Sequence, residues 1–211
     1  MKTFGVIAGT PQDTRMGVEF LKKKGLDAVG IPTASSPEEQ NLLQYQRAGA
    51  LTQKVIDIIG EFHKKDINSI IIYCNSLSAA LDLDLVKSRC PASTILTPLE
   101  AYRNLASRYS RLVVWAANAQ CLKVIEGILY DSNPSIRIIG VTLLPMVSAI
   151  EKLLPPEDIF EEFGLSCLLP RNFRAEGLVL GCTHFPYLKE ILEERLDVKV
   201  IDPMEELLTS I

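Results

Sequence analysis

The sequence lacks the features that mark several large classes of protein. No apolar run reaches the roughly 18 residues of a membrane span, and Met1 to Gly9 has no charged leader ahead of an apolar signal core. The 22 Lys and Arg residues are outnumbered by 26 Asp and Glu residues, and no stretch gathers the basic residues that neutralise a phosphate backbone. We therefore expect a soluble, cytoplasmic protein that binds neither a membrane nor nucleic acid.

Several motifs of nucleotide and hydrolase chemistry are also missing. Gly5 and Gly9 do not make G-x-G-x-x-G, and neither a G-x-x-x-x-G-K-[ST] loop nor a G-x-S-x-G elbow is present. The cysteines are odd in number and contain no C-x-x-C pair, which argues against a disulfide framework and against a structural zinc site. They are Cys74, Cys90, Cys121, Cys167 and Cys182. Any cysteine chemistry is therefore expected to use thiols.

Short apolar, β-branched runs alternate with longer amphipathic stretches along the chain. This alternation predicts β-α-β units and mainly parallel sheets, because strands covered by helices on both faces read as continuous apolar runs. The expected strands are 3–8, 28–31, 69–73, 94–97, 112–115, 136–141, 177–180 and 198–201. The expected helices are 37–60, opened by the cap Ser36, and 103–110 and 119–130, whereas 155–162 is either a short helix or a loop.

The length of the chain permits one large core or two small ones, since domains commonly have about 100 to 150 residues. A strand-like segment ends at Pro98 and a new helix follows, which indicates a crossover between two halves. We assign residues 1–97 to a first α/β domain and residues 98–189 to a second. The tail, residues 190–211, is predicted to return to the first domain.

Cys74 and Cys182 occupy the same place in two predicted strand-helix units. Each follows a buried strand and precedes a polar turn and a helix, which is where open α/β sheets place their ligand crevices. The nearby helix amino terminus favours a thiolate over a thiol. His184, two residues after Cys182, is a candidate for activating that thiol further.

Two matched thiols suit a reaction that removes a proton from one face of a carbon acid and returns a proton to the other. One thiol acts as the base while its opposite acts as the acid, and the roles exchange in the reverse direction. Polar neighbours Asn75, Ser76 and Thr183, with the backbone amides of the two turns, are expected to hold a carboxylate and to stabilise charge at the α-carbon.

A structural role is the competing interpretation of each of these residues. A cysteine at a strand end is more often a packing residue than a reactive one, and only the matched pair favours chemistry. The other three cysteines lack polar turn neighbours and are expected to pack or to be inert surface thiols. Tyr73 is expected to pack, and His63, in a charged string, is expected to be a solvated helix end.

Residues 74–76 (Cys-Asn-Ser) and 181–186 (Gly-Cys-Thr-His-Phe-Pro) resemble the two catalytic motifs of the aspartate/glutamate racemase superfamily. The second motif looks especially like glutamate racemases. Residues 5–14 are more similar to the start of aspartate racemases, and 201–207 resemble the family's closing segment. The resemblance implies two pseudo-symmetric α/β domains with the active site in the cleft between them, a homodimer, no pyridoxal phosphate or other cofactor, and no metal.

The sequence departs from the family pattern around the substrate. Glutamate racemases carry an Asp-Ser pair after the first strand, where this chain has Ala8 and Gly9. The family's threonine-containing turn is replaced by residues 115–119, in which Asn118 is a partial substitute, and residues 31–34 lack the Pro-Tyr-Gly of glutamate racemases. These differences bear on the substrate rather than on the class of reaction.

We therefore predict a cofactor-independent isomerase that racemises glutamate, aspartate or a related carboxylate by 1,1-proton transfer between two cysteines. The expected catalytic residues are Cys74, Cys182 and His184, with the two thiols facing each other across the active site. The expected substrate-binding residues are Gly9, Thr10, Asn75, Ser76, Asn118 and Thr183. The alternatives are maleate isomerase-like or decarboxylase chemistry, and a non-catalytic ligand-binding or regulatory protein on the same fold.

Overall fold

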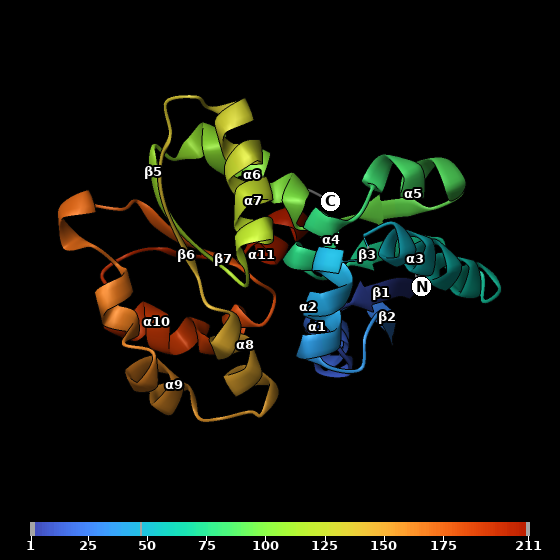
Figure 1. The fold of residues 1–211 in the computed structure, drawn as a ribbon, viewed down its shortest axis with the longest axis horizontal. Coiled ribbons are helices and arrows are strands. Elements are labelled where there is room, and N and C mark those ends of the chain that lie inside the picture. The colour runs from blue at the N-terminus through green and yellow to red at the C-terminus, as the bar shows by residue number, and fades with distance from the viewer. Residues whose placement is uncertain (1–2, 47, 210–211) are drawn as a thin grey trace. The chain divides into compact units, whose positions relative to one another are not determined.

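The structure is a computed structural model that describes residues 3–46 and 48–209. The chain forms two compact units, residues 1–98 and 99–211, and each contains one four-stranded parallel sheet (Figure 1). The predicted fold, two parallel sheets flanked by helices, is confirmed. Among the described residues, no helix is both long enough and apolar enough to cross a membrane.

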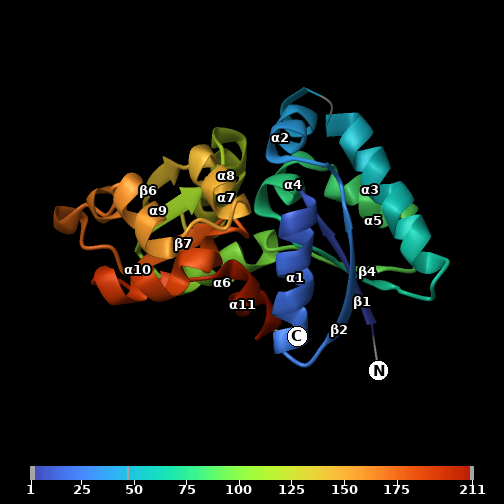
Figure 2. The same cartoon turned by 90° about the horizontal axis from the view of Figure 1, so that it is seen from below.

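The first unit has the strand order β2-β1-β3-β4. Its strands are β1 (Thr3–Ala8), β2 (Asp27–Pro32), β3 (Ser69–Ile72) and β4 (Thr94–Leu96). Its helices are α1 (Pro11–Lys23), α2 (Pro37–Gln46), α3 (Ala48–His63), α4 (Asn75–Ala80) and α5 (Leu83–Arg89). Helix α1 covers one face of this sheet, and α3 and α5 lie on the other (Figure 2).

The long helix predicted over 37–60 is divided into α2 and α3 on either side of residue 47, which lies outside the described residues. The predicted cap is present, because the backbone N–H of Glu39 donates to Ser36 Oγ at 3.2 Å. An amphipathic pattern does not reveal a division of this kind when apolar residues continue on both sides of it. The division separates α2, which carries polar side chains toward the site described below, from α3, which packs on the sheet.

Alternating side chains divide the first sheet between its two helical layers. Ile7, Ile70 and Ile72 belong to a buried cluster with the apolar residues of α3. Val6 and Tyr73 face α1 instead, where a Cβ at Gly17 would lie 2.7 Å from the Tyr73 ring. Gly17 therefore lets α1 approach the sheet closely, and both faces of the sheet are buried, as the continuous apolar runs predict.

The second unit repeats this architecture with the strand order β6-β5-β7-β8. Its strands are β5 (Arg111–Ala116), β6 (Arg137–Thr142), β7 (Gly177–Gly181) and β8 (Val200–Ile201). Its α-helices are α6 (Leu99–Arg108), α7 (Ala119–Ser132), α8 (Leu144–Glu151), α9 (Pro156–Glu162), α10 (Lys189–Arg195) and α11 (Pro203–Leu208), and its 3-10 helices are η1 (Leu165–Leu168), η2 (Arg171–Phe173) and η3 (Phe185–Leu188). The segment 155–162, left open between helix and loop, contains α9. Trp115 in β5 is fully buried.

Both sheets have the order second, first, third, fourth strand. In each sheet, the second strand lies on one side of the first strand, and the third and fourth strands lie on its other side. The carboxyl ends of the first and third strands therefore flank a topological switch point, which is the place where open α/β sheets bind ligands. In the first unit this point lies between the ends of β1 and β3, and in the second between the ends of β5 and β7.

The predicted return of residues 190–211 to the first domain is wrong for the described part of that segment. Helix α10, β8 and α11 belong to the second unit, and β8 extends its sheet through the pairs Leu178–Val200 and Val179–Ile201. The physical reason is that β7 offers a buried edge to a short apolar strand. Residues 210 and 211 of the predicted tail, and residues 1 and 2 of the predicted first domain, lie outside the described residues.

We predict that Ile201→Ala lowers the free energy of unfolding by about 2 to 4 kcal/mol, because a buried isoleucine leaves a cavity when it is truncated. Ile201 is 2% exposed, and its side chain lies over Gly177 on the neighbouring strand. Denaturant unfolding followed by circular dichroism measures the change. The control is Leu153→Ala, at a side chain that is 55% exposed, and an equal effect of both changes would contradict the placement of β8.

Candidate functional site

Cys74 and Cys182 have similar places, each just after the third strand of its own sheet. Tyr73 alone separates Cys74 from β3, and α4 begins at the next residue, whereas Cys182 directly follows Gly181, the last residue of β7. Both side chains are buried, at 3% and 5% exposure. In each unit the thiol lies beyond the carboxyl end of a buried strand, where the sequence predicted it.

The Cys74 thiol contacts two neutral polar side chains. The carboxamide of Gln40 donates to the sulfur, with 3.3 Å between Nε2 and Sγ, and Ser76 Oγ lies 3.5 Å from the same sulfur. Gln44, one helical turn after Gln40 on α2, donates to Ser76 Oγ at 3.1 Å. Two glutamines from α2 thus contact the turn that carries Cys74.

The turn after β1 is held by buried polar contacts that involve two predicted binding residues. Thr10 caps α1, because its Oγ1 accepts from the backbone N–H of Asp13 at 3.1 Å. The backbone N–H of Gly9 donates to Asp13 Oδ2 at 3.3 Å. Thr33 adds a hydrogen bond from its Oγ1 to the carbonyl of Ala8 at 3.1 Å. The structure therefore brings Gly9 and Thr10 to the same strand ends as Cys74.

Asn75 and Ser76 form the first two positions of α4, and both side chains are buried. Ser76 is joined to Cys74 and Gln44 as described above. The position of Asn75 at the start of the helix directs its backbone N–H out of the helical hydrogen-bonding pattern. The predicted neighbourhood of the first thiol is therefore assembled within the first unit.

The Cys182 thiol has an ionisable partner. His184 Nδ1 lies 3.7 Å from Cys182 Sγ, and His184 Nε2 lies 2.7 Å from Glu151 Oε1 at the end of α8. The imidazole is 3% exposed and the Glu151 side chain 16%. A carboxylate on one ring nitrogen fixes the orientation and tautomer of the imidazole, so that the other nitrogen can exchange a proton with the thiol.

The two other predicted residues of the second unit also lie at the strand ends. Asn118 caps α7, because its Oδ1 accepts from the backbone N–H of Cys121 at 2.9 Å, and it therefore has the position in this unit that Thr10 has in the first. Thr183 lies between Cys182 and His184 and is 2% exposed. The second unit thus gathers Asn118, Cys182, Thr183 and His184 at one edge of its sheet.

Sequence reasoning missed Gln40, Gln44, Glu151 and Tyr102. The spacing of the two glutamines, four residues apart on a helix, was a usable signal that they share one face. Glu151 contacts His184 from 33 positions away, which no local pattern reveals. Cys121, predicted to pack, contacts the carbonyl of Gly181 through its sulfur at 3.8 Å.

Tyr102 is fully buried on α6, in the same unit as Cys182. Burial raises the pKa of its hydroxyl well above 10.0, and Cys121, Asp202 and Cys182 raise it further. The phenol therefore stays neutral at neutral pH. Its proton is available for hydrogen bonding rather than for transfer.

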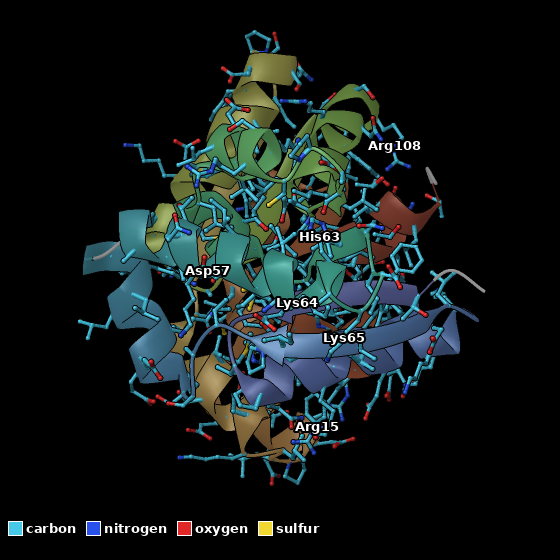
Figure 3. The ribbon with its side chains drawn as sticks, turned by 90° about the vertical axis from the view of Figure 1, so that its right-hand side faces the viewer. Arg15, Asp57, His63, Lys64, Lys65 and Arg108 are labelled. Atoms are coloured by element: carbon cyan, nitrogen blue, oxygen red, sulfur yellow. The ribbon has the colours of Figure 1, made fainter. Side chains whose placement is uncertain are left out.

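Cys90, Cys167 and His63 lie at other places in the two units, at the end of α5, in η1 and at the end of α3. All five cysteines are reduced, and burial raises the pKa of the Cys90 thiol while Cys167 is exposed. Figure 3 labels His63, Lys64 and Lys65 at the end of α3. His63 is only partly solvated, because its Nε2 lies 2.6 Å from Ser93 Oγ. Within residues 3–46 and 48–209, no three His, Cys, Asp or Glu side chains form a group that could hold a metal ion.

We predict that the stability of the protein falls as the pH rises above 10.0, and that Tyr102→Phe makes this fall less steep. A raised pKa in the folded state means that only the unfolded chain ionises this phenol, so its stabilisation is present below 10.0 and is lost above it. The slope of the unfolding free energy against pH should differ between the unaltered protein and Tyr102→Phe by about 1.4 kcal/mol per pH unit. Urea unfolding at several alkaline pH values measures it, with Tyr130→Phe, at an exposed tyrosine, as the control.

The sequence is similar to known proteins over most of its length. The sequence model described as Asp/Glu/Hydantoin racemase matches residues 8–211. A glutamate racemase of Fusobacterium nucleatum subsp. nucleatum is 29% identical over 167 residues, which cover 74% of this chain and 59% of that protein. The first curated relatives are matched over 56 to 59% of their own length.

Solved structures share the fold. The glutamate racemase from Francisella tularensis subsp. tularensis SCHU S4, in complex with D-glutamate, has a TM-score of 0.73 at 18% identity and is matched over 99% of this chain and 79% of its own. Picrophilus torridus aspartate racemase has a TM-score of 0.71 at 16% identity, over 100% and 92% of the two chains. Because the family model extends over nearly the whole sequence, the chain belongs to the Asp/Glu/Hydantoin racemase family.

Proposed function

We propose that the protein is a cofactor-independent racemase of an acidic amino acid, with Cys74 and Cys182 as its two proton-transfer groups. The observation that supports this most directly is the similar placement of a buried thiol after the third strand of each sheet. Each thiol has a polar partner within its own unit. Glutamate is the first substrate to test because the curated relatives matched here are glutamate racemases, and aspartate is the second.

In the proposed reaction one cysteine, as thiolate, takes the α-proton from one face of the substrate and becomes a thiol. The other cysteine, as thiol, gives its proton to the opposite face and becomes a thiolate. One proton leaves the substrate and one returns, so the product is the enantiomer. His184, oriented by Glu151, serves Cys182 by accepting and returning its proton between turnovers.

The substrate carboxylate is proposed to bind at the turns beside the thiols. The backbone amides of Asn75 and Ser76 at the start of α4, together with Thr183, supply the donors. Thr10 and Asn118 cap helices through their side-chain oxygens, so they would serve a carboxylate through the Thr10 hydroxyl proton and Asn118 Nδ2. Gly9 is proposed to contact the substrate through its backbone. We also propose that the protein is a cytoplasmic homodimer and that its ligand is the small amino-acid substrate.

We predict that the protein exchanges the α-proton of glutamate or aspartate for deuterium in heavy water, and that Cys74→Ala and Cys182→Ala each abolish racemisation. Loss of one acid–base group costs about a hundredfold to ten-thousandfold in rate. Proton NMR of the L- and D-amino acids measures exchange, and circular dichroism measures racemisation. The matched control is Cys167→Ala, because that thiol is exposed.

Racemisation that survives in both single variants would overturn the two-thiol mechanism. Ligand binding without any α-proton exchange by the unaltered protein would instead support the non-catalytic alternative. Loss of carbon dioxide from a malonate-type substrate would support decarboxylase chemistry.

We predict that Glu151→Gln slows proton transfer at Cys182 by about 10- to 100-fold, because it removes the carboxylate acceptor of the hydrogen bond that orients His184. The effect should be larger for the enantiomer whose proton Cys182 removes. Deuterium wash-in, started separately from each enantiomer, measures the two faces. Glu157→Gln, at an exposed position of α9, is the control, and an equal loss for both enantiomers would contradict a role confined to Cys182.

A further inference from the structure

Gln40 occupies space that any side chain at position 9 would need. A Cβ built on Gly9 would lie 2.0 Å from Gln40 Nε2, 2.1 Å from Cδ and 2.2 Å from Oε1. All three distances are far inside van der Waals contact. The Gln40 carboxamide therefore lies against the backbone of the turn after β1.

The backbone at position 9 does not itself require glycine. The glycines with positive φ in the described residues are Gly25 and Gly164, so Gly9 has a conformation that an L-residue can adopt. The atoms in the way belong to the end of a flexible side chain rather than to the backbone. An alanine at position 9 can therefore be accommodated if Gln40 moves away from Cys74.

The carboxamide held in this space contacts the first thiol. Gln40 is 8% exposed, and its Nε2 donates to Cys74 Sγ at 3.3 Å. An N–H donor is a better partner for a negatively charged sulfur than for a neutral one. A carboxamide does not titrate, so Gln40 can stabilise charge on the sulfur but cannot take its proton, in contrast to His184 beside Cys182.

We propose that Gln40 is the positioning residue for Cys74: its carboxamide, in the space left open by Gly9, fixes the sulfur and stabilises it as a thiolate. A glycine at position 9 is thus needed to leave room for the Gln40 carboxamide beside the thiol. It is not needed for the conformation of the backbone. Gln44 supports the arrangement from the next turn of α2 through Ser76. The inference deepens the proposed function by assigning the resting charge of one of its two thiols.

The test is the alkylation rate of Cys74 by iodoacetamide in the full-length protein, read peptide by peptide by mass spectrometry. It requires no turnover, so its outcome is independent of whether the protein racemises any amino acid. Exposed Cys167 is the internal reference for reagent and pH. The variants are Gln40→Met, which keeps the length of the side chain without the donor, Gly9→Ala, and the two combined.

At neutral pH we expect Gln40→Met and Gly9→Ala each to slow alkylation of Cys74 by about threefold to tenfold, since the loss of a charged hydrogen bond is partly offset by a more nucleophilic thiolate. The double variant should be no slower than Gln40→Met alone, because Gly9 acts through Gln40. Gly60→Ala on α3, where a Cβ meets no atom within 4 Å, should leave the rate unchanged.

Repeating the series at alkaline pH separates charge from access to the sulfur. Once every thiol is ionised, the variants should alkylate as fast as the unaltered protein or slightly faster, because their thiolates are more nucleophilic, whereas reduced access to the sulfur would keep them slower. Asp13, whose side chain accepts the Gly9 N–H, is present in every variant and so is common to all the rates compared. Unchanged or faster alkylation of Gln40→Met at neutral pH, slower alkylation of the variants that persists at alkaline pH, or additive losses in the double variant would each overturn the proposal.

Discussion

The register between the first and third strands of each sheet is the constraint on which the surroundings of both thiols depend. Ile7 pairs with Ile72 in the first sheet and Ala116 with Gly181 in the second, so the turns that follow these pairs emerge side by side. A shift of one residue would turn the side chains of a strand to the opposite face and bury the wrong set. Packing on both faces of the sheets therefore fixes where the thiols lie, because the same helices that bury the strands enforce the register.

The main features of the fold were predictable from the sequence, and the interactions across it were not. Eight apolar runs marked the strands, because a strand covered by helices on both faces of its sheet has apolar residues at successive positions. The cysteines and their polar turns could be found because they are adjacent to those runs. Gln40 and Glu151 reach the two thiol neighbourhoods from 34 and 33 residues away, which only the folded chain brings about. The strand β8 was predicted at 198–201 but assigned to the wrong domain, because an apolar run does not specify which sheet the strand joins.

The two thiols differ in the kind of help that they receive. Cys74 is contacted by amide and hydroxyl groups, which hold a fixed charge state, whereas Cys182 is contacted by an imidazole that can gain or lose a proton. A racemase that uses matched residues does not need matched neighbours, because the two faces of its substrate are distinct. The repeated topology of the units therefore provides similar positions for the sulfurs, while the side chains around them provide different chemistry.

Trp115 is the single tryptophan of the chain, and its burial in β5 makes the second unit optically distinguishable from the first. Its indole lies one residue before the carboxyl end of β5, at the level of Leu180 on the neighbouring strand. Indole emission depends on the polarity and rigidity of its surroundings, so intrinsic fluorescence is a native reporter of that half of the chain alone. A titration followed by indole emission therefore reports on the second unit without any attached dye.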